Sequence, residues 1–510
     1  MEEIAFRVKR GFDTISSLQF PTYFYDVSTQ RKPQRHAQHL LQINHTRSLY
    51  HALIQPHLSK QARNAARHCL DVHLQQAKLR PFPFSENIED IQPWLERRSS
   101  QVNKDYRAYL HSRRQGAPRR YFTSKSHALH FLHTMAPTRM TDGAWLFGFL
   151  KRWQDVRYAP LCKIYLNIVG EGNEYRNQVV QYQRLLDDNE CRDWRTLDDQ
   201  YYMQGVIRLA LGQNVEQYLP EIIGFNLGYQ QVSLAMLVAA YELNEMNIKS
   251  HYFTLGATTE DACSASAVKM LQPLLADAPS LAARQALLAR VASGYQLHKV
   301  GMDIPAMVEN FDLQKEFLCL MQPRMHALKR IHRIDCLERG ILPKWLSHPS
   351  APALMMQLYE EGWTDTGDVA MVQRSGLWLT MQRENILPQG YELQVLIDWL
   401  GQSKDYAKRL SHLSADCLRA INHQASSLIE GIYDPVQKEI MGQQGGDALD
   451  RMNESSSQDD IMNLLIRLIA PLMHHTQEGL RAARIYQSVL EKGSQLYSQH
   501  HAFFLMRDVV

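Results

Sequence analysis

The chain has 510 residues, with 56 lysines and arginines against 53 aspartates and glutamates, giving a formal net charge of +3. This length predicts one large domain with extensions, or two or three domains, with ample chain to bury a core. Because the basic residues are spread out and nearly balanced, the composition argues against a nucleic-acid-binding surface.

Cysteine usage and hydropathy indicate the compartment. The seven cysteines are an odd number without CxxC spacing, which predicts reduced thiols and a cytoplasmic protein. Met1 to Arg10 mixes acids and bases, so we expect no secretory signal. The most apolar run, Val232 to Tyr241, is shorter than the ~20 residues that cross a bilayer, so we expect no membrane span.

Residues 1–120 alternate polar helical patterns with breaks, of which RPFPFS at 80–85 is the firmest. These helices are rich in His, Gln and Arg and have modest apolar stripes. We therefore predict a helical N-terminal arm that packs on the main body.

A more informative segment begins at Tyr121. Its three histidines, spaced by three, are compatible with a zinc or iron site, but a partly solvated helix is favoured because steps of three drift around a helix; they are His127, His130 and His133. A second helix is predicted to begin after Pro137, with Thr141 or Asp142 as its N-cap and Trp145 on its buried face.

Two helices joined by a glycine-bearing turn are predicted over 165–187. The apolar stripe of the second helix consists of Val179, Tyr182, Leu185 and Leu186.

The most apolar predicted helix runs from Ile222 to Tyr241, after Pro220 in its first turn, and has no wide polar face, so we expect it to be central. Gly224 and Gly228 lie four residues apart and would let a neighbouring backbone approach closely. Glu221 stands in this apolar setting, where a carboxylate must pair, protonate or bind a cation.

The rest of the chain predicts further helices. Residues 301–440 form a helical second region, in which Trp378 and Trp399 are packing residues and the group His326, His332 and Asp335 favours a surface helix over a metal site. Residues 441–460 are polar and rich in glycine and serine, which predicts a linker. Residues 461–510 predict a docked pair of terminal helices.

Four segments together resemble one family, the heme-oxygenase-like diiron oxidases or iron-containing redox enzymes. They are APTRMTDGAWL at 136–146, GEGNEYRNQVVQYQRLL at 170–186, PEIIGFNLGYQ at 220–230 and YFTLGATTEDAC at 252–263. The resemblance covers about 121–400 and implies an all-α fold, a heme-oxygenase-like helical bundle with helical N- and C-terminal extensions. The core would span 121–300.

The same resemblance implies where iron ligands would stand, and most of these positions are substituted. The family's HxxxDxxH element falls on Gly256, Glu260 and Cys263, its second-helix His on Gln178, and its central-helix acid on Gln230 or Gln231. The acids that survive as metal-ligand candidates are Glu221, Glu260 and Asp142, and the expected pocket comprises Trp145, Gln178, Gly224, Gly228, Gln231 and Gly256. Two iron ions need about six carboxylate and imidazole ligands, so a conventional site is not expected.

Three hypotheses for the function stay open. The favoured one is a pseudoenzyme that keeps the fold and binds a small-molecule ligand or a partner protein, without nucleic acid and without a metal cofactor. The second is a non-heme iron oxidase or oxygenase of a small metabolite, with histidines such as His127, His130 or His251 completing the site. The third is a metal-independent enzyme with Cys263 as nucleophile and Glu260 as base. A homodimer is compatible with each.

Overall fold

The computed structural model describes most of the first 320 residues and two later segments. The described residues are 46–55, 58–81, 90–191, 194–231, 233–255, 268, 271–272, 274–317, 319–320, 382, 388–401 and 458–491. Within them every named element is a helix, and the one β contact is an isolated bridge between Val169 and Asn177. The all-α prediction is confirmed.

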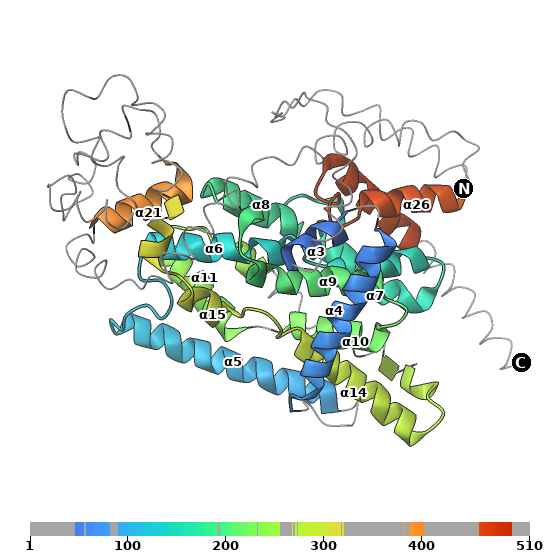
Figure 1. Cartoon of the computed structure of the whole chain (residues 1–510). Helices are drawn as coiled ribbons and strands as arrows, with labels where there is room; N and C mark the ends of the chain where they lie inside the picture. Colours follow the sequence, from blue (N-terminus) through green and yellow to red (C-terminus); the bar gives the residue numbers. More distant parts are fainter. Residues whose placement is uncertain are drawn as a thin grey trace, which may run out of the picture.

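The helices form one packed body, in which segments far apart in sequence lie side by side (Figure 1). In chain order they are α3 (Thr46–Leu53), α4 (Lys60–Lys78), α5 (Ile91–Arg114), α6 (Lys125–Arg139), η3 (Ala144–Arg152), η4 (Val156–Tyr158), α7 (Ala159–Ile168), η5 (Gly170–Gly172), α8 (Gln178–Asp188), η6 (Trp194–Thr196), η7 (Asp199–Tyr202), α9 (Met203–Gln213), α10 (Leu219–Tyr229), α11 (Leu234–Glu245), α12 (Tyr252–Leu255), α14 (Leu281–Leu297), α15 (Ile304–Glu309), α21 (Gly390–Gly401) and α26 (Gln458–Leu468). The η elements are 3-10 helices.

The described N-terminal helices pack on this body, while their assignment to a separate arm stays a prediction. Helix α4 begins at the N-cap Ser59, whose hydroxyl accepts from the Ala62 amide. Its apolar residues at helical spacing, among them Ala66 and Leu70, are buried against α9 and α14. Figure 1 shows α5 running along the lower edge of the molecule. One hydrophobic cluster includes residues from Leu49 to Leu490, while the four predicted boundaries between the five segments stay predictions.

Helix α6 differs from expectation in two respects. It continues through Pro137, which stands in its last turn and removes one i→i−4 hydrogen bond, the one to the His133 carbonyl. The residues of α6 from Ser126 to Thr138, except His133, are buried because α8, α9, α15 and α21 surround the helix. The predicted partly solvated helix is therefore wrong.

The predicted helix–turn–helix at 165–187 is confirmed as α7, η5 and α8. Gly170 has a φ of 79°, and a Cβ atom there would lie 2.4 Å from the Asn177 amide nitrogen, so the turn requires glycine. Asn177 caps α8 by accepting from the amides of Val179 and Val180. The predicted stripe of α8 is buried, with Tyr182 fully so.

The predicted central helix is two helices, α10 and α11, bent by 42°. Helix α10 ends where the backbone N–H groups of Gln230 and Gln231 donate to the carbonyls of Asn226 and Gly228. The side chain of Ser233 then caps α11. The expected single helix to Tyr241 is thus wrong. Helix α10 ends at Gln230 and Gln231, and Ser233 begins a new helix, α11. Among the described helices none is by itself long and apolar enough to cross a bilayer, although α10 and α11 together pass that test by length and composition.

The C-terminal helices dock as predicted. Trp399 of α21 is buried and stacks on Phe317 with ring centroids 3.9 Å apart, which confirms its packing role. Helix α26 and the helix at 477–491 contact the core, where Tyr486 donates to the Leu150 carbonyl. Because α26 begins at Gln458, the predicted linker ends before its expected limit of 460. Residues 442–457, Trp378 and the group at 326–335 lie outside the described residues.

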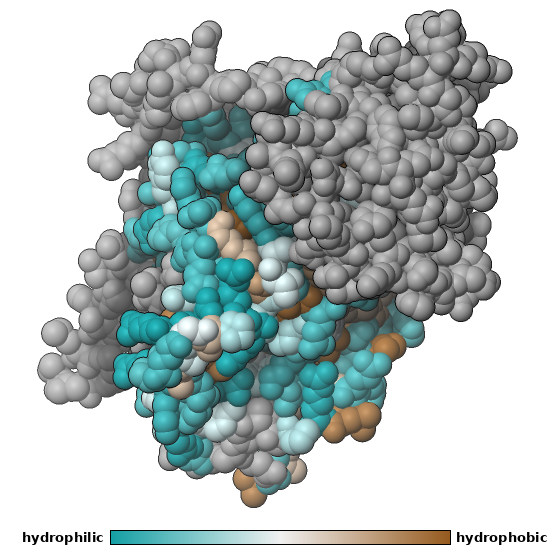
Figure 2. Space-filling view, turned by 90° about the vertical axis from the view of Figure 1, so that its left-hand side faces the viewer, coloured by the Kyte–Doolittle hydropathy of each residue, from teal (hydrophilic) through white to brown (hydrophobic). Residues whose placement is uncertain are grey.

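Where Figure 2 draws described residues, most of them are hydrophilic, and the hydrophobic ones form small separate groups. The large apolar side chains lie inside instead, including the fully buried Trp145, Tyr165 and Tyr182. The polar residues buried with them therefore identify the candidate site.

Candidate functional site

Asp142 lies at the centre of a buried polar cluster between α6, α9 and α12. Its side chain is fully buried, and both carboxylate oxygens are engaged: Arg208 Nη1 donates to Oδ1, and the Tyr252 hydroxyl donates to Oδ2 over 2.6 Å. Arg139 Nη1 lies 3.7 Å from Oδ1. Gly143, with a φ of 84°, is the N-cap of η3 and makes no side-chain cap bond, so the predicted N-cap at Thr141 or Asp142 is wrong.

Two guanidinium groups face this single acid. Arg208 comes from the otherwise apolar interior of α9, and its Cζ lies 5.4 Å from the ring centroids of both Trp145 and Tyr229. Burial alone lowers the pKa of Arg139, but Tyr252 and Asp142 outweigh it and raise that pKa, so the group stays protonated. The cluster thus holds two permanent positive charges and one negative charge.

Aromatic and amide side chains continue the cluster toward α8 and α10. The indole of Trp145 donates to Asn226 Oδ1 over 3.3 Å, and its ring centroid lies 4.4 Å from that of Tyr229. The Tyr229 hydroxyl donates to Gln178 Oε1 over 2.8 Å. The structure therefore brings the predicted pocket residues Trp145 and Gln178 into one chain of contacts with Asp142.

His298, at the end of α14, closes this side of the cluster. It packs on Gly228, where an added Cβ atom would lie 2.9 Å from the His298 Cβ. Burial, then Arg208 and Arg139, lower the pKa of His298 to about 3, so the imidazole is neutral near pH 7. Gly228 thus has the predicted close neighbour.

Glu221 is held in a different pair. Arg290 Nε and Nη2 donate to its two carboxylate oxygens over 2.6 and 2.7 Å, and Arg290 Nη2 also donates to the Gln217 carbonyl. The side chain of Arg290 is 43% exposed and that of Glu221 is 8% exposed, so this pair stands at the rim of α10 and α14. Of the three outcomes expected for Glu221, namely pairing, protonation or cation binding, the structure shows pairing, with a bidentate guanidinium as the partner.

The remaining predicted site residues stand as follows. Gly224 lies where α10 and α14 cross. The backbone N–H of Gln231 donates to the Gly228 carbonyl at the end of α10. Gly256, Glu260 and Cys263 lie outside the described residues. The catalytic pair Glu260 and Cys263 and the three-acid metal set therefore stay predictions.

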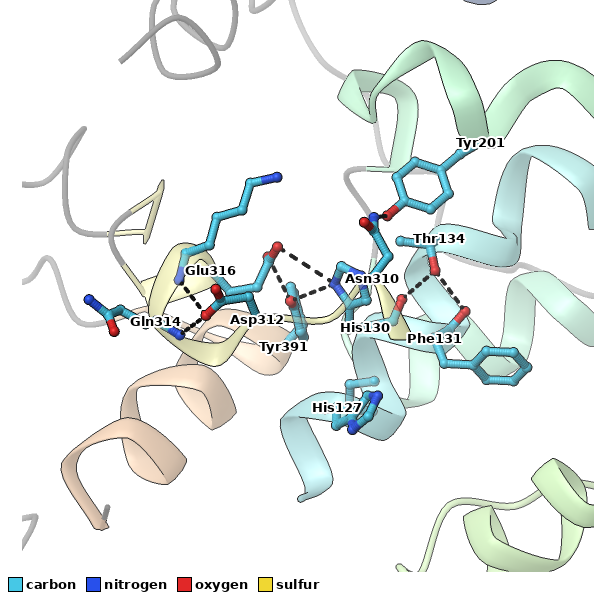
Figure 3. A network of polar contacts seen from close by, with 12 residues as sticks. His127, His130, Phe131, Thr134, Tyr201, Asn310, Asp312, Gln314, Glu316 and Tyr391 are labelled. Carbon is cyan, nitrogen blue, oxygen red and sulfur yellow. Dashed lines mark hydrogen bonds and ion pairs between the residues drawn. The ribbon is translucent and has the colours of Figure 1, made fainter. Parts of the chain in front are cut away.

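The histidines of α6 form a second buried network (Figure 3). His127 Nε2 donates to the Val308 carbonyl over 2.9 Å, and its ring stacks on Phe311. His130 Nδ1 lies 3.2 Å from the Tyr391 hydroxyl, which donates to Glu316 over 2.8 Å.

Among the described residues, the acid that contacts His130 and Tyr391 is Glu316, which comes from far along the chain. Burial lowers the pKa of His130 to about 3 and raises that of Glu316. Within the described ranges no three His, Cys, Asp or Glu residues are grouped so that they could hold a metal ion. His251 is exposed on a turn, whereas His127 and His130 are buried in α6. The structure therefore does not bring these three histidines together.

Comparison with known proteins identifies the family of the chain segment that contains this cluster. A family model described as iron-containing redox enzyme matches residues 129–296, from α6 to α14. This part of the chain belongs to the iron-containing redox enzyme family. No curated protein and no solved structure matches the chain. The resemblance seen in the motifs and the heme-oxygenase-like fold are thereby confirmed.

The family implies iron, but the described residues of the cluster do not suit two iron ions. A divalent ion about 4 Å from one guanidinium is repelled by on the order of 8 kcal/mol at an effective dielectric of 20. Asp142 is bound by two such groups, and Glu221 by a third. The neighbours that could donate to a metal here are a neutral histidine, amides and phenols, which compensate little of an ion's charge.

The sequence interpretation missed the two arginines that decide this chemistry. Arg208 is the lone charge in the apolar stretch GVIRLALG, and a buried arginine requires an acidic partner. Arg139 stands three residues before Asp142 on the same turn. These two signals were present in the sequence, whereas the Arg290–Glu221 pair spans too many residues to be read there.

Proposed function

We propose that this protein is a member of the iron-containing redox enzyme family that binds a small-molecule ligand and carries out no diiron oxygen chemistry. One observation supports this most directly: both oxygens of Asp142 accept from Arg208 and Tyr252, with Arg139 beside them. A metal ion would have to displace these donors and then lie next to two permanent cations.

The same contacts suit ligand binding. The cluster is lined by aromatic rings, Trp145, Tyr229 and Tyr252, with a few polar groups between them. Sites for small molecules usually combine such apolar walls with a small number of placed polar groups. Burial keeps the hydroxyl of Tyr252 protonated by raising its pKa, and His298 is neutral, so neither acts as an anionic metal ligand near pH 7.

Metal analysis of the purified full-length chain tests the proposal. Cells are grown with added iron, and the protein is also incubated anaerobically with Fe(II) and desalted. We expect well under one iron per chain, since the candidate ligands Asp142 and Glu221 are paired with arginines, and no O2 consumption on exposure to air. The matched control is the variant R208Q, which removes one buried cation.

Two results would contradict the proposal. Near-stoichiometric iron, two ions per chain with oxygen consumption, would instead favour a non-heme iron oxidase with Glu260 among its ligands. Loss of a measured turnover on alkylation of Cys263, with no metal present, would favour the thiol-dependent alternative.

A further inference from the structure

We propose that Arg139 and Arg208 bind the oxyanion group of a small ligand, a carboxylate or a phosphate, beside Asp142. This inference rests on the proposed function, because it assigns to a ligand the surroundings of Asp142, one of the predicted metal-ligand candidates.

The charge of the cluster supports an anion. Arg139 and Arg208 are both buried guanidinium groups, and Asp142 is the one acid that forms an ion pair with either of them within the described part of the chain. His298, with its pKa lowered to about 3, adds no charge near pH 7. Among the described residues, one positive charge of the cluster therefore has no counter-charge, and buried charges are normally paired.

The hydrogen-bond inventory supports the same conclusion. Arg139 Nε, Arg208 Nε and Asn226 Nδ2 are buried donors that have no hydrogen-bond partner among the described residues. Arg208 is 3% exposed and Asn226 is fully buried. Unpartnered buried donors are rare in folded proteins, and an anion with two or more oxygens accepts from several at once.

Arg139 is the guanidinium with the most unused capacity. Its Nη1 lies 3.7 Å from Asp142, and its Nη2 contacts the sulfur of Met236 at 4.0 Å. Neither contact is a short hydrogen bond, and the Cζ lies 5.8 Å from the Tyr252 ring centroid. A guanidinium that makes no short hydrogen bond keeps its N–H groups free for bidentate recognition of an oxyanion.

The position of Arg139 also offers access. Its side chain is 14% exposed, whereas that of Arg208 is 4% exposed. Met236, next to Arg139, lies in the partly exposed first half of α11. The oxyanion would reach Arg139 first, and the apolar part of a ligand would contact Met236 and Tyr252.

Ligand binding by the full-length protein tests this inference. Thermal unfolding and calorimetric titration are run at constant ionic strength with inorganic phosphate in one arm and benzoate in the other, each up to about 10 mM, with chloride as the reference. The variants are R139Q and R139K, with R107Q as matched control, since Arg107 is an exposed arginine of α5. Circular dichroism confirms that each variant is folded.

We expect a rise in Tm with one of the two anions for the native chain and for R107Q. We expect at least about tenfold weaker binding for R139Q, and intermediate binding for R139K, which keeps the charge without the planar fork. A response to phosphate alone identifies a phosphorylated ligand, and a response to benzoate alone identifies a carboxylate with an apolar body.

Absence of binding by both anions, or equal weakening in R107Q and R139Q, would overturn the inference. If the metal analysis also finds the chain free of iron, the proposed function stands and the anion site alone is rejected. Two bound iron ions would reject the proposed function and the anion site together.

Discussion

Gly294 of α14 lies directly against the carbonyl oxygen of Glu221 in α10, so that a Cβ atom at Gly294 would be 1.9 Å from that oxygen. Gly224 is its counterpart on α10, where an added Cβ atom would be 1.8 Å from the Val291 carbonyl oxygen. The two helices therefore cross backbone to backbone. This crossing fixes both the Glu221–Arg290 pair and the contact of His298 with Gly228.

The variant G294A tests this crossing. Alanine in a helix interior is favoured over glycine by about 1 kcal/mol, but here its methyl group meets backbone that cannot rotate away. We expect a net loss of about 3 kcal/mol or more in the free energy of unfolding, measured by urea denaturation. The reverse substitution at an exposed position of α14, A286G, is the control and should cost about 1 kcal/mol. A G294A protein as stable as the native chain would refute the close crossing.

The pair Arg208–Asp142 predicts a coupled response to mutation. D142N leaves the buried Arg208 without its acid and should cost about 3–5 kcal/mol, whereas R208Q leaves Asp142 with Arg139 as its remaining cation and should cost about 1–3 kcal/mol. The double variant should cost clearly less than the sum of the two, which a double-mutant cycle measures. The exposed pair Glu174–Arg184 serves as control, where E174Q should cost about 0–1 kcal/mol. Additive losses in the cycle would mean that the two side chains do not interact.

Glu242 of α11 predicts a further structural effect. Its fully buried carboxylate accepts from the Tyr109 hydroxyl over 2.6 Å and from the backbone amides of Arg120, Tyr121 and Phe122. The variant E242Q places an NH2 group against these donors, so we expect a loss of about 3 kcal/mol.

The control for E242Q lies one turn away, at Glu245, which pairs with Arg113 at the surface. E245Q should change the free energy of unfolding by less than about 1 kcal/mol. Equal losses for the two variants would show that the carboxylate of Glu242 does not fix the loop between α5 and α6.

Buried histidines predict acid sensitivity. Burial lowers the pKa of His130, His298 and His474 to about 3 and that of His475 to about 4. Because these folded-state values lie below the ordinary 6.5, the unfolded chain binds more protons between pH 6.5 and 4. Stability is full above pH 6.5 and falls with acidification, by up to about 1.4 kcal/mol per pH unit for each imidazole. Burial also lowers the pKa of His127, so Glu316, whose pKa is raised, acts in the opposite direction as one group against five imidazoles.

The variant H298Q isolates one of these groups. Its imidazole faces Arg208, Arg139, Lys299 and Arg98, which all disfavour protonation. Between pH 6.5 and 4 the slope of the free energy of unfolding should become shallower by about 1.4 kcal/mol per pH unit than in the native chain. H68Q, at an exposed position of α4, should leave the slope unchanged. A slope unaltered by H298Q would show that His298 titrates normally.

Local patterns predicted the fold well, and long-range contacts limited the prediction of the site. The spacing of Gly224 and Gly228 and the stripe containing Tyr182 depend on residues within one helix, and the structure has both. The partners of Asp142 and His130 come from elements that only tertiary packing brings near, as Glu316 does for His130. The end of α10 was missed because backbone hydrogen bonds from Gln230 to Asn226 and Gly228 close it, and the side chain of Ser233 then caps α11, which an apolar pattern does not reveal.

Thiol reactivity gives a prediction that bears on the alternative with Cys263 as nucleophile. Four of the seven cysteines are described, all as free thiols, and burial raises the pKa of Cys69 to about 11 and that of Cys162, Cys191 and Cys319 to about 12. Since the thiolate is the nucleophile, these four should react slowly with an alkylating agent at pH 7.5 while the protein is native, and rapidly in denaturant.

Mass spectrometry of peptides from a time course of alkylation locates the label. The variant C263S serves as control: a fast phase that vanishes in it belongs to Cys263 and would favour the thiol-dependent hypothesis, whereas a fast phase that persists belongs to another thiol. Rapid labelling of Cys162 or Cys191 in the native chain would contradict the packing of α7 and α8, because both sulfurs are buried against backbone carbonyl groups of Phe149 and Leu129.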